Sequence, residues 1–200
     1  MVVRSIAWVK TAATGLEFAD VEIDDRRMRA TGVAIGSDPL PYRLDYSFAS
    51  RSRFVTKWIE LEAHGQGWSR SLRLKRDRAG EWDARWETHG EALLPPPTGD
   101  MSSLREALDC DVALSPLTNT MPVLRHGLLR EGAPQDLLMA WISVPDLSIV
   151  PSRQRYAFVR TDELVSVVRY ESESRDFTAD IVFDDDGLVV EYPGIGHRLS

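Results

Sequence analysis

Asp109 and Asp111, which flank the single cysteine of the chain, have the spacing best suited to acid–base chemistry. In an extended strand, residues two apart lie on the same face and roughly 6.8 Å apart, close to the separation of carboxylates in inverting glycosidases. A second interpretation is that both carboxylates are solvated or hydrogen-bonded on a polar strand face. We favour the second, because an acidic chain produces such pairs through composition alone.

A run of uncharged hydroxyl and amide side chains, Thr118, Asn119 and Thr120, lies between Pro116 and Pro122. Such groups donate and accept hydrogen bonds without a charge that must be desolvated, which suits the edge of a sugar or another neutral polar head group. The alternative is a turn in which Asn and Thr side chains bond to their own backbone. From these residues alone, the turn is favoured.

Arg153, Gln154, Arg155 and Tyr156 form a third group, at the expected start of a strand. Alternation places the two arginines on one face and Gln154 with Tyr156 on the other. Arginine forks match phosphate or carboxylate, so an anionic head group is one interpretation. Cross-strand pairing with Asp or Glu is the other, and it is favoured.

The sequence lacks the common signatures of metal and cofactor sites. The acidic run 184–187 has neither the ligand spacing nor the final Glu of a calcium loop, and it predicts a turn. The four histidines are scattered, and there is no second cysteine to complete a zinc site. Without a phosphate-binding glycine loop, a dinucleotide fingerprint or a G-x-S-x-G motif, we predict no metal, no cofactor and no enzymatic activity.

The elements that must position these residues are predicted to be strands. Residues 42–49, 68–75, 82–87 and 177–184 alternate between apolar and polar side chains, with a break at Val182. This period of two is typical of an antiparallel sheet with one buried face.

Turn signals separate the predicted strands. They lie at Gly65-Gln66-Gly67, Asp77-Arg78-Ala79-Gly80 and Asp186-Gly187, and they favour hairpins. Residues 95–100 are expected to be a loop, followed by a short helix that Ser102 or Ser103 caps and that ends near Leu108. About ten or more strands in sequential hairpins predict one mostly β domain over residues 1–200: a single large, strongly curved antiparallel sheet forming a half-open barrel, with little helix.

Several strands are apolar on both faces, namely 137–142, 164–168 and 188–190. Such strands either pack against a second layer or line a hydrophobic groove. Because little helix is predicted to cover them, an apolar groove is one interpretation. The other, equally supported, is a sheet that curls and fills its own interior.

The composition limits the function classes. The 24 Lys and Arg against 31 Asp and Glu give a net charge of −7, which argues against nucleic acid as the main partner. No apolar run is long enough to span a membrane. A single cysteine, Cys110, suits a reducing compartment and is expected to be a core residue. Because the first ten residues also lack the pattern of a secretory signal, a cytoplasmic location is expected.

Segments 108–112, 115–122, 144–147, 154–156 and 186–194 occur in a recognisable order, with a Thr-Asn-Thr-x-Pro motif and a terminal Tyr192-Pro193-Gly194. From about residue 42 onward, the chain thereby resembles the bacterial putative glycolipid-binding family, formerly a domain of unknown function. Glu191 and residues 195–198 depart from the Asp-Tyr-Pro-Gly-Leu ending of that family. The resemblance implies a half-open antiparallel barrel, related in shape to bacterial lipoprotein-carrier and lipid-binding folds, with an apolar inner face.

Three hypotheses follow. The first is non-catalytic binding of a lipid or glycolipid in an apolar groove on the concave face, with a polar rim for the head group. The second is a protein-interaction scaffold or subunit that uses the groove or the open sheet edges, for example in a homodimer. The third is a hydrolase with Asp109 and Asp111 as acid and base. The first is preferred, and its expected ligand-binding residues are Asp109, Asp111, Thr118, Asn119, Thr120, Gln154, Arg155, Tyr156 and Tyr192.

Overall fold

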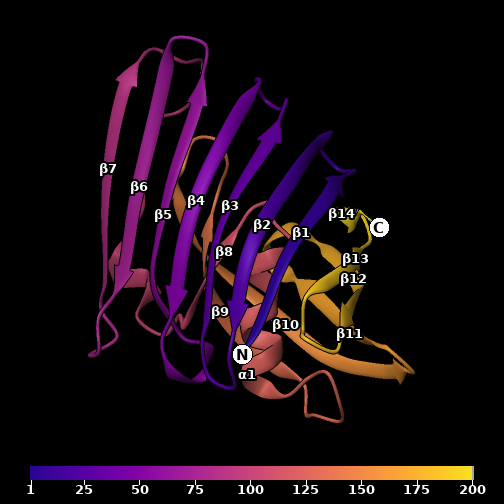
Figure 1. Cartoon of the computed structure of the whole chain (residues 1–200). Coiled ribbons are helices and arrows are strands. Elements are labelled where there is room, and N and C mark those ends of the chain that lie inside the picture. Colours follow the sequence, from indigo (N-terminus) through magenta and orange to yellow (C-terminus); the bar gives the residue numbers. More distant parts are fainter. Residues whose placement is uncertain (200) are drawn as a thin grey trace.

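Fourteen strands form one continuous sheet in the computed structural model, which describes residues 1–199 (Figure 1). In chain order the strands are β1 Val2–Lys10, β2 Gly15–Ile23, β3 Met28–Gly36, β4 Tyr42–Ser50, β5 Thr56–Gly65, β6 Trp68–Arg76, β7 Trp82–Gly90, β8 Asp109–Val112, β9 Gln135–Ile142, β10 Ile149–Asp162, β11 Val165–Ser172, β12 Phe177–Asp184, β13 Val189–Tyr192 and β14 Gly196–Arg198.

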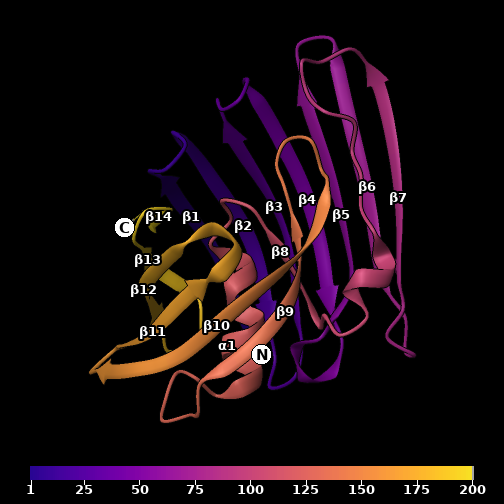
Figure 2. The ribbon, with the colours of Figure 1, turned by 180° about the vertical axis from the view of Figure 1, so that it is seen from behind.

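The sheet is an antiparallel meander with two exceptions to simple order. β14 pairs with β1, which joins the C-terminal strands to the N-terminal ones, and β8 pairs in parallel with β9. The two edge strands, β7 and β8, do not pair with each other, so the sheet is open. β1–β7 form a broad layer, and β8–β13 lie across one side of it with the single α-helix (Figures 1 and 2). The predicted fold class, a mostly β, curved and half-open sheet, is confirmed.

The predicted alternation corresponds to burial in the broad layer. On β4, Tyr42, Leu44, Tyr46 and Phe48 are buried against the second layer, whereas the intervening side chains lie on the outer face. A core cluster with members from each of β1–β7, and from β8 and β9, occupies the inner face. Within residues 1–199, the inner face of this layer is therefore lined by buried side chains of the protein itself.

β9 shows why some strands are apolar on both faces. Leu138, Ala140 and Ile142 pack in the large core, whereas Leu137 and Met139 on the other face pack in a second cluster with β10–β13. Leu188 and Val189 divide between the two cores in the same way. These strands are apolar on both faces because they lie between two cores. This agrees with the interpretation that such strands pack against a second layer.

The predicted hairpin turns at 65–67, 77–80 and 186–187 are all present, between β5 and β6, β6 and β7, and β12 and β13. Gly67, Gly80 and Gly187 have φ of 77°, 94° and 78°, which a side chain with Cβ adopts only with strain. The loop expected at 95–100 is also found, between β7 and a 3₁₀ turn.

The helical segments differ from the prediction. They are η1 Ser52–Phe54, η2 Met101–Leu104, η3 Leu117–Asn119, α1 Thr120–His126 and η4 Glu173–Arg175. The helix expected from Ser102 or Ser103 to Leu108 is the single turn η2, and its cap is Asp100, whose carboxylate accepts from the Ser102 amide at 3.0 Å. The sequence interpretation missed α1, although Pro122 in its first turn and Gly127 at its C-cap, with φ of 65°, are helix-end signals.

Within residues 1–199, no helix has the length and apolar character needed to cross a membrane.

Candidate functional site

All but one of the residues expected to bind a ligand lie together where β8, the η3–α1 segment and β10 meet beneath β11 and β13. The parallel pairing of β8 with β9 brings Asp109 and Asp111 to this position, and the two-residue period of β10 turns Gln154 and Tyr156 toward them. The aromatic ring of Tyr192 reaches the group through Tyr170, with ring centroids 5.8 Å apart. The remaining residue, Arg155, lies elsewhere.

Asp109 is held by a buried ion pair. Arg125, on the last turn of α1, donates from both terminal nitrogens to the two carboxylate oxygens, with Nη1 2.7 Å from Oδ1. The side chains of Arg125 and Asp109 are only 2% and 0% exposed. A bidentate pair of this kind neutralises the charge of the carboxylate and fixes its orientation. Asp109 is therefore placed to fasten α1 to β8 rather than to contact a ligand.

Asp111, two residues further along β8, has only neutral hydrogen-bond partners. Thr118 donates to Oδ1 at 2.9 Å, and the Gln154 amide donates to Oδ2 at 2.7 Å. Burial raises the pKa of Asp111, an effect that the Gln154 bond, the charge of Arg175 and the Thr118 bond partly offset. A buried carboxylate with a raised pKa and no ion pair is typical of functional sites.

Tyr156 connects Gln154 with the η3 turn. Its hydroxyl faces two carbonyl acceptors, Oδ1 of Asn119 at 2.9 Å and Oε1 of Gln154 at 3.0 Å. One O–H cannot fully serve two acceptors, so the proton is shared between them. Burial raises the pKa of Tyr156 well above its usual value, which keeps this proton in place.

Thr120 is fully buried but takes no part in these bonds. Its hydroxyl, in the first turn of α1, has no hydrogen-bond partner among the residues that the structure describes.

A cavity of about 340 Å³ lies against the group. Three of the expected residues line it: Asp111, Asn119 and Tyr192. Most of the remaining wall is apolar or aromatic, from Val112, Ala113, Leu114, Trp141, Val144, Tyr170, Phe177 and Ile195, with Ser115, Ser143 and Arg175 as further polar members. The cavity thus combines an aromatic wall with one carboxylate, one amide, two serine hydroxyls and one guanidinium.

Arg175 closes part of this wall and was not anticipated from the sequence. Its guanidinium lies over the ring of Trp141, 5.0 Å from the centroid, and donates to the hydroxyl of Tyr170. A guanidinium on an aromatic face is a favourable cation–π arrangement. No local motif identifies Arg175, because it reaches Trp141 from η4, far along the chain.

A second buried network lies behind Ser115. The Ser115 hydroxyl donates to Glu17 at 2.6 Å, the Tyr46 hydroxyl donates to the same oxygen at 2.8 Å, and Lys10 lies 3.3 Å from the other oxygen. Lys10 and Glu17 are 1% and 0% exposed. Their inward positions on β1 and β2 follow from the two-residue period, which was the one signal that could have identified them.

Arg155 lies on the opposite face of β10, as alternation predicts. It forms an exposed pair with Asp136 on β9, with Nη1 at 2.7 and 2.8 Å from the two oxygens. This is the cross-strand interpretation, so Arg155 does not belong to a rim around Asp111. It lines a separate pocket of about 780 Å³, together with Arg153.

Cys110 lies between Asp109 and Asp111 on β8, and its side chain is in the large core cluster. It is fully buried, and burial raises the pKa of its thiol to about 12. The expected role as a small core residue is consistent with this position. In the described part of the chain, no group of three or more His, Cys, Asp or Glu side chains is arranged to hold a metal ion.

Comparison with known proteins gives one solved relative and one family. The chain is similar to a DUF1089 family protein from Pseudomonas aeruginosa, with 29% sequence identity, a TM-score of 0.69 and 92% of each chain covered. No curated protein matches the chain. The family described as "Putative glycolipid-binding" matches residues 5–198, nearly the whole sequence. The chain therefore belongs to this family, as its Thr-Asn-Thr-x-Pro and Tyr-Pro-Gly motifs predict.

Proposed function

We propose that the protein binds a lipid or glycolipid without catalysing its conversion, and that the ligand enters the cavity beside Asp111. The observation that carries this proposal is the composition of the cavity wall, in which aromatic and aliphatic side chains surround a few polar groups: one carboxylate, one amide, two serine hydroxyls and the Arg175 guanidinium. Ligand sites are commonly apolar spaces with few polar groups that fix orientation. The family description supports the same class of ligand.

The polar groups of the wall suit hydroxyl donors. Each oxygen of Asp111 accepts one bond from the protein, from Thr118 or Gln154, whereas a carboxylate oxygen can accept two. A sugar or glycerol hydroxyl can therefore donate to Asp111 without displacing either partner. Trp141, Phe177 and Tyr192 supply the apolar area against which a ring or an acyl segment packs.

The filled interior of the sheet determines where an acyl chain can lie. Because the large core occupies the inner face of β1–β7, the concave-face groove expected from the sequence gives way to the cavity at β8 and β11–β13. Its volume lies at the lower end of the range for small-molecule sites. We infer that it takes a head group or part of an acyl chain and leaves the rest of the ligand outside.

The two alternatives fit the geometry less well. A carboxylate pair for hydrolysis needs both groups at the substrate, whereas Asp109 is bonded to Arg125 and does not line the cavity. Strand addition would use the free edge of β7, where Asp83, Arg85 and Glu87 alternate, and charges on an edge strand oppose such pairing.

Calorimetric titration with octyl glucoside below its micelle concentration, and with 1-octanol as the sugar-free comparison, tests the proposal. We expect the glucoside to bind more tightly than the alcohol, and we expect Ala113→Phe, which fills the cavity, to abolish binding. Ala133→Phe places the same side chain on an exposed loop and should bind as the wild type does. Equal binding by both variants would show that the cavity is not the site.

A further inference from the structure

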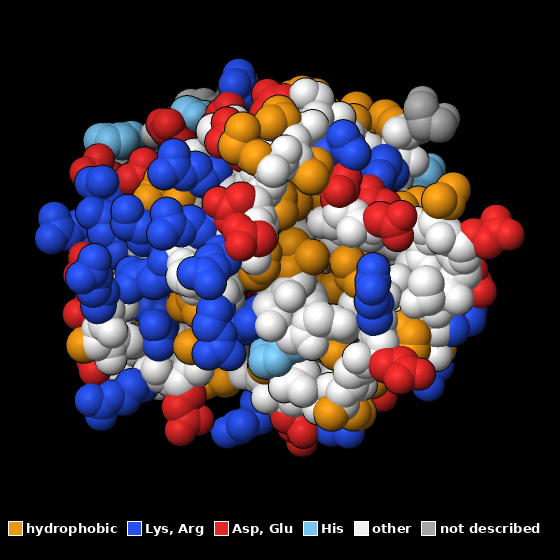
Figure 3. Space-filling view, turned by 60° about the horizontal axis from the view of Figure 1, so that its bottom comes forward, with side chains coloured by type: hydrophobic (Ala, Val, Ile, Leu, Met, Phe, Trp, Pro, Cys, Tyr) orange, Lys and Arg blue, Asp and Glu red, His pale blue; other side chains and the backbone are white. Residues whose placement is uncertain are grey.

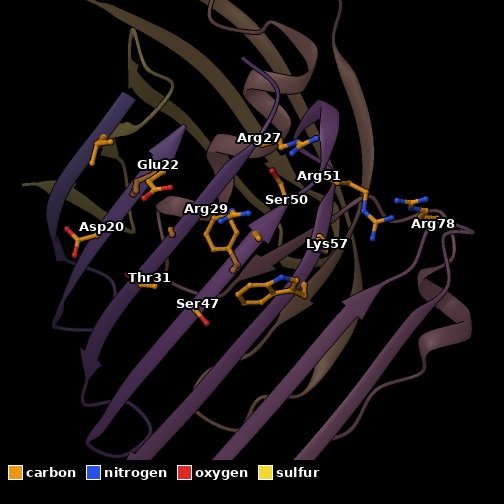
Figure 4. A pocket seen from close by; sticks show the side chains of 16 residues that line it. Asp20, Glu22, Arg27, Arg29, Thr31, Ser47, Ser50, Arg51, Lys57 and Arg78 are labelled. Atoms are coloured by element: carbon orange, nitrogen blue, oxygen red, sulfur yellow. The ribbon is translucent and has the colours of Figure 1, made fainter. Parts of the chain in front are cut away.

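A second concave region lies on the outer face of the broad layer, away from the cavity. It is an open groove of about 770 Å³ across β1–β5, lined by Arg27, Arg29, Arg51, Lys57 and Arg78 (Figure 4). Trp58 and the hydroxyls of Thr31, Ser47 and Ser50 complete much of the wall. Figure 4 shows Arg27, Arg51 and Arg78 toward one end of the groove and the acidic Asp20 and Glu22 toward the other.

Strand register explains why the groove exists. Arg29 on β3, Ala49 on β4 and Trp58 on β5 are direct cross-strand partners, so a small side chain lies between two large ones on the outer face. Next to Ala49 the pairing of β4 and β5 shifts by one residue and leaves Lys57 as the extra residue of a bulge. A bulge redirects its side chain, which accounts for the position of Lys57 at the groove.

The basic side chains of the groove form no ion pairs. Among residues 1–199, none of the five cations lies within ion-pair distance of a carboxylate. Exposed arginines elsewhere on the sheet, such as Arg73 and Arg169, do have such partners. This gathering of like charge occurs in a chain of net charge −7. Repulsion among these cations is unfavourable in the free protein. The acidic side chains of the groove, Asp20 and Glu22, lie toward the end away from Arg51 and Arg78, where Glu22 is the cross-strand partner of Arg29.

The backbone holds these cations close to one another. Arg51 donates to the Arg76 carbonyl, and the Phe54 amide donates to the Arg26 carbonyl at 2.9 Å, which ties η1 to the β2–β3 turn. Arg53 and Phe54 both have positive φ, 63° and 56°, in the connection that carries Arg51. The Nε of Arg51 is buried without a partner in the described structure. Figure 3 shows Lys and Arg side chains gathered on the left of the face that it presents.

We propose that the outer groove is a binding site for a phosphate-bearing ligand, with the phosphate between Arg27, Arg51, Lys57 and Arg78. Guanidinium forks match the geometry of phosphate oxygens, and Lys57 adds a point charge. The indole of Trp58 and the hydroxyls of Thr31 and Ser47 face the part of the ligand that follows the phosphate. The site is separate from the cavity, so either proposal can fail without the other. A lipid head group and a soluble phosphate ester share this chemistry.

Two probes distinguish the sources. Inorganic pyrophosphate, followed by calorimetry, reports a soluble ligand, and co-sedimentation with phosphatidylcholine vesicles, with and without phosphatidylglycerol, reports a lipid head group. The test variant is Arg27→Gln/Lys57→Gln/Arg78→Gln. The control is Arg85→Gln/Arg155→Gln/Arg160→Gln, which removes the same charge from exposed, carboxylate-paired sites elsewhere.

We expect the test variant to bind about tenfold more weakly than the wild type to whichever probe the wild type prefers, and the control to bind as the wild type does. Ala49→Leu keeps every charge but fills the groove, and it should weaken binding similarly. No binding of either probe, equal losses in the two triple variants, or full binding by Ala49→Leu would each overturn the proposal.

Discussion

Asp109 and Asp111 lie two residues apart on β8, and both are almost completely excluded from solvent, at 0% and 6% exposure. Arg125 neutralises Asp109, whereas Asp111 receives hydrogen bonds only from Thr118 and Gln154. Burying a carboxylate without an ion pair is costly to stability. The difference is that Asp109 joins α1 to β8 through Arg125, whereas Asp111 lines the cavity that we propose as the ligand site.

The largest expected effect comes from breaking the buried ion pair of Arg125 with Asp109. Arg125→Met leaves Asp109 buried and unpaired, and we expect it to lower the free energy of unfolding by about 3–5 kcal/mol. Urea denaturation measures this loss. Arg169→Met removes an exposed pair with Asp180 and should cost far less, because solvent screens that pair. Similar losses in the two variants would contradict a special role for the buried pair.

Tyr156→Phe tests the neutral network that surrounds Asp111. The change removes the hydroxyl shared by Asn119 and Gln154 and leaves two buried carbonyl oxygens without their donor. We expect a loss of about 1–3 kcal/mol in the free energy of unfolding, smaller than that of Arg125→Met. A loss below the error of urea denaturation would show that these two bonds do not stabilise the site.

Asp111→Asn sharpens the comparison through pH. Because burial raises the pKa of Asp111, the folded state binds its proton more tightly than the unfolded chain, in which the pKa of aspartate is about 3.9. The free energy of unfolding of the wild type therefore falls as the pH rises from the unfolded pKa to the folded pKa. Below the unfolded pKa this loss is absent. The difference in unfolding free energy, variant minus wild type, should become more positive across this window in urea titrations at a series of pH values. Parallel pH profiles for the two proteins would contradict the raised pKa.

Arg155→Ala should have the smallest effect. Its exposed pair with Asp136 lies on the other face of β10, so we expect a change of about 0–1 kcal/mol in unfolding free energy and no change in octyl glucoside binding. Weaker binding of octyl glucoside in calorimetry would show that Arg155 does contribute to the ligand site, although it lies on the other face of β10.

Sequence patterns predicted more of the fold than of the candidate site. Period-two alternation and the glycine turns depend on nearby residues, so the strands at 42–49 and 68–75 and their hairpins could be predicted. Asp111, Thr118 and Gln154 were all expected to be ligand-binding residues, because of their residue types and the family motifs in which they lie. The partner of Asp109 was not predicted, because Arg125 belongs to a short helix that forms only when it packs against β8.

The outer groove and the cavity wall show a second limit. Arg27, Arg51 and Arg78 come from three different turns, and Trp141 on β9 meets Arg175 from η4, so no local pattern links them. Apolar strands such as 137–142 were correctly recognised as two-sided. Whether such a strand separates two cores or lines a groove depends on what packs against it, which only the three-dimensional structure shows.

Native mass spectrometry of the protein purified from its own host, followed by organic extraction of bound lipid, tests the central claim most directly. We predict that the wild type carries a stoichiometric lipid or glycolipid, that Ala133→Phe retains it, and that Ala113→Phe is free of it. The same spectra report whether the protein is a monomer or a homodimer. A ligand-free mass for the wild type, or equal loading of the Ala113→Phe variant, would contradict the assignment of the cavity as a lipid-binding site.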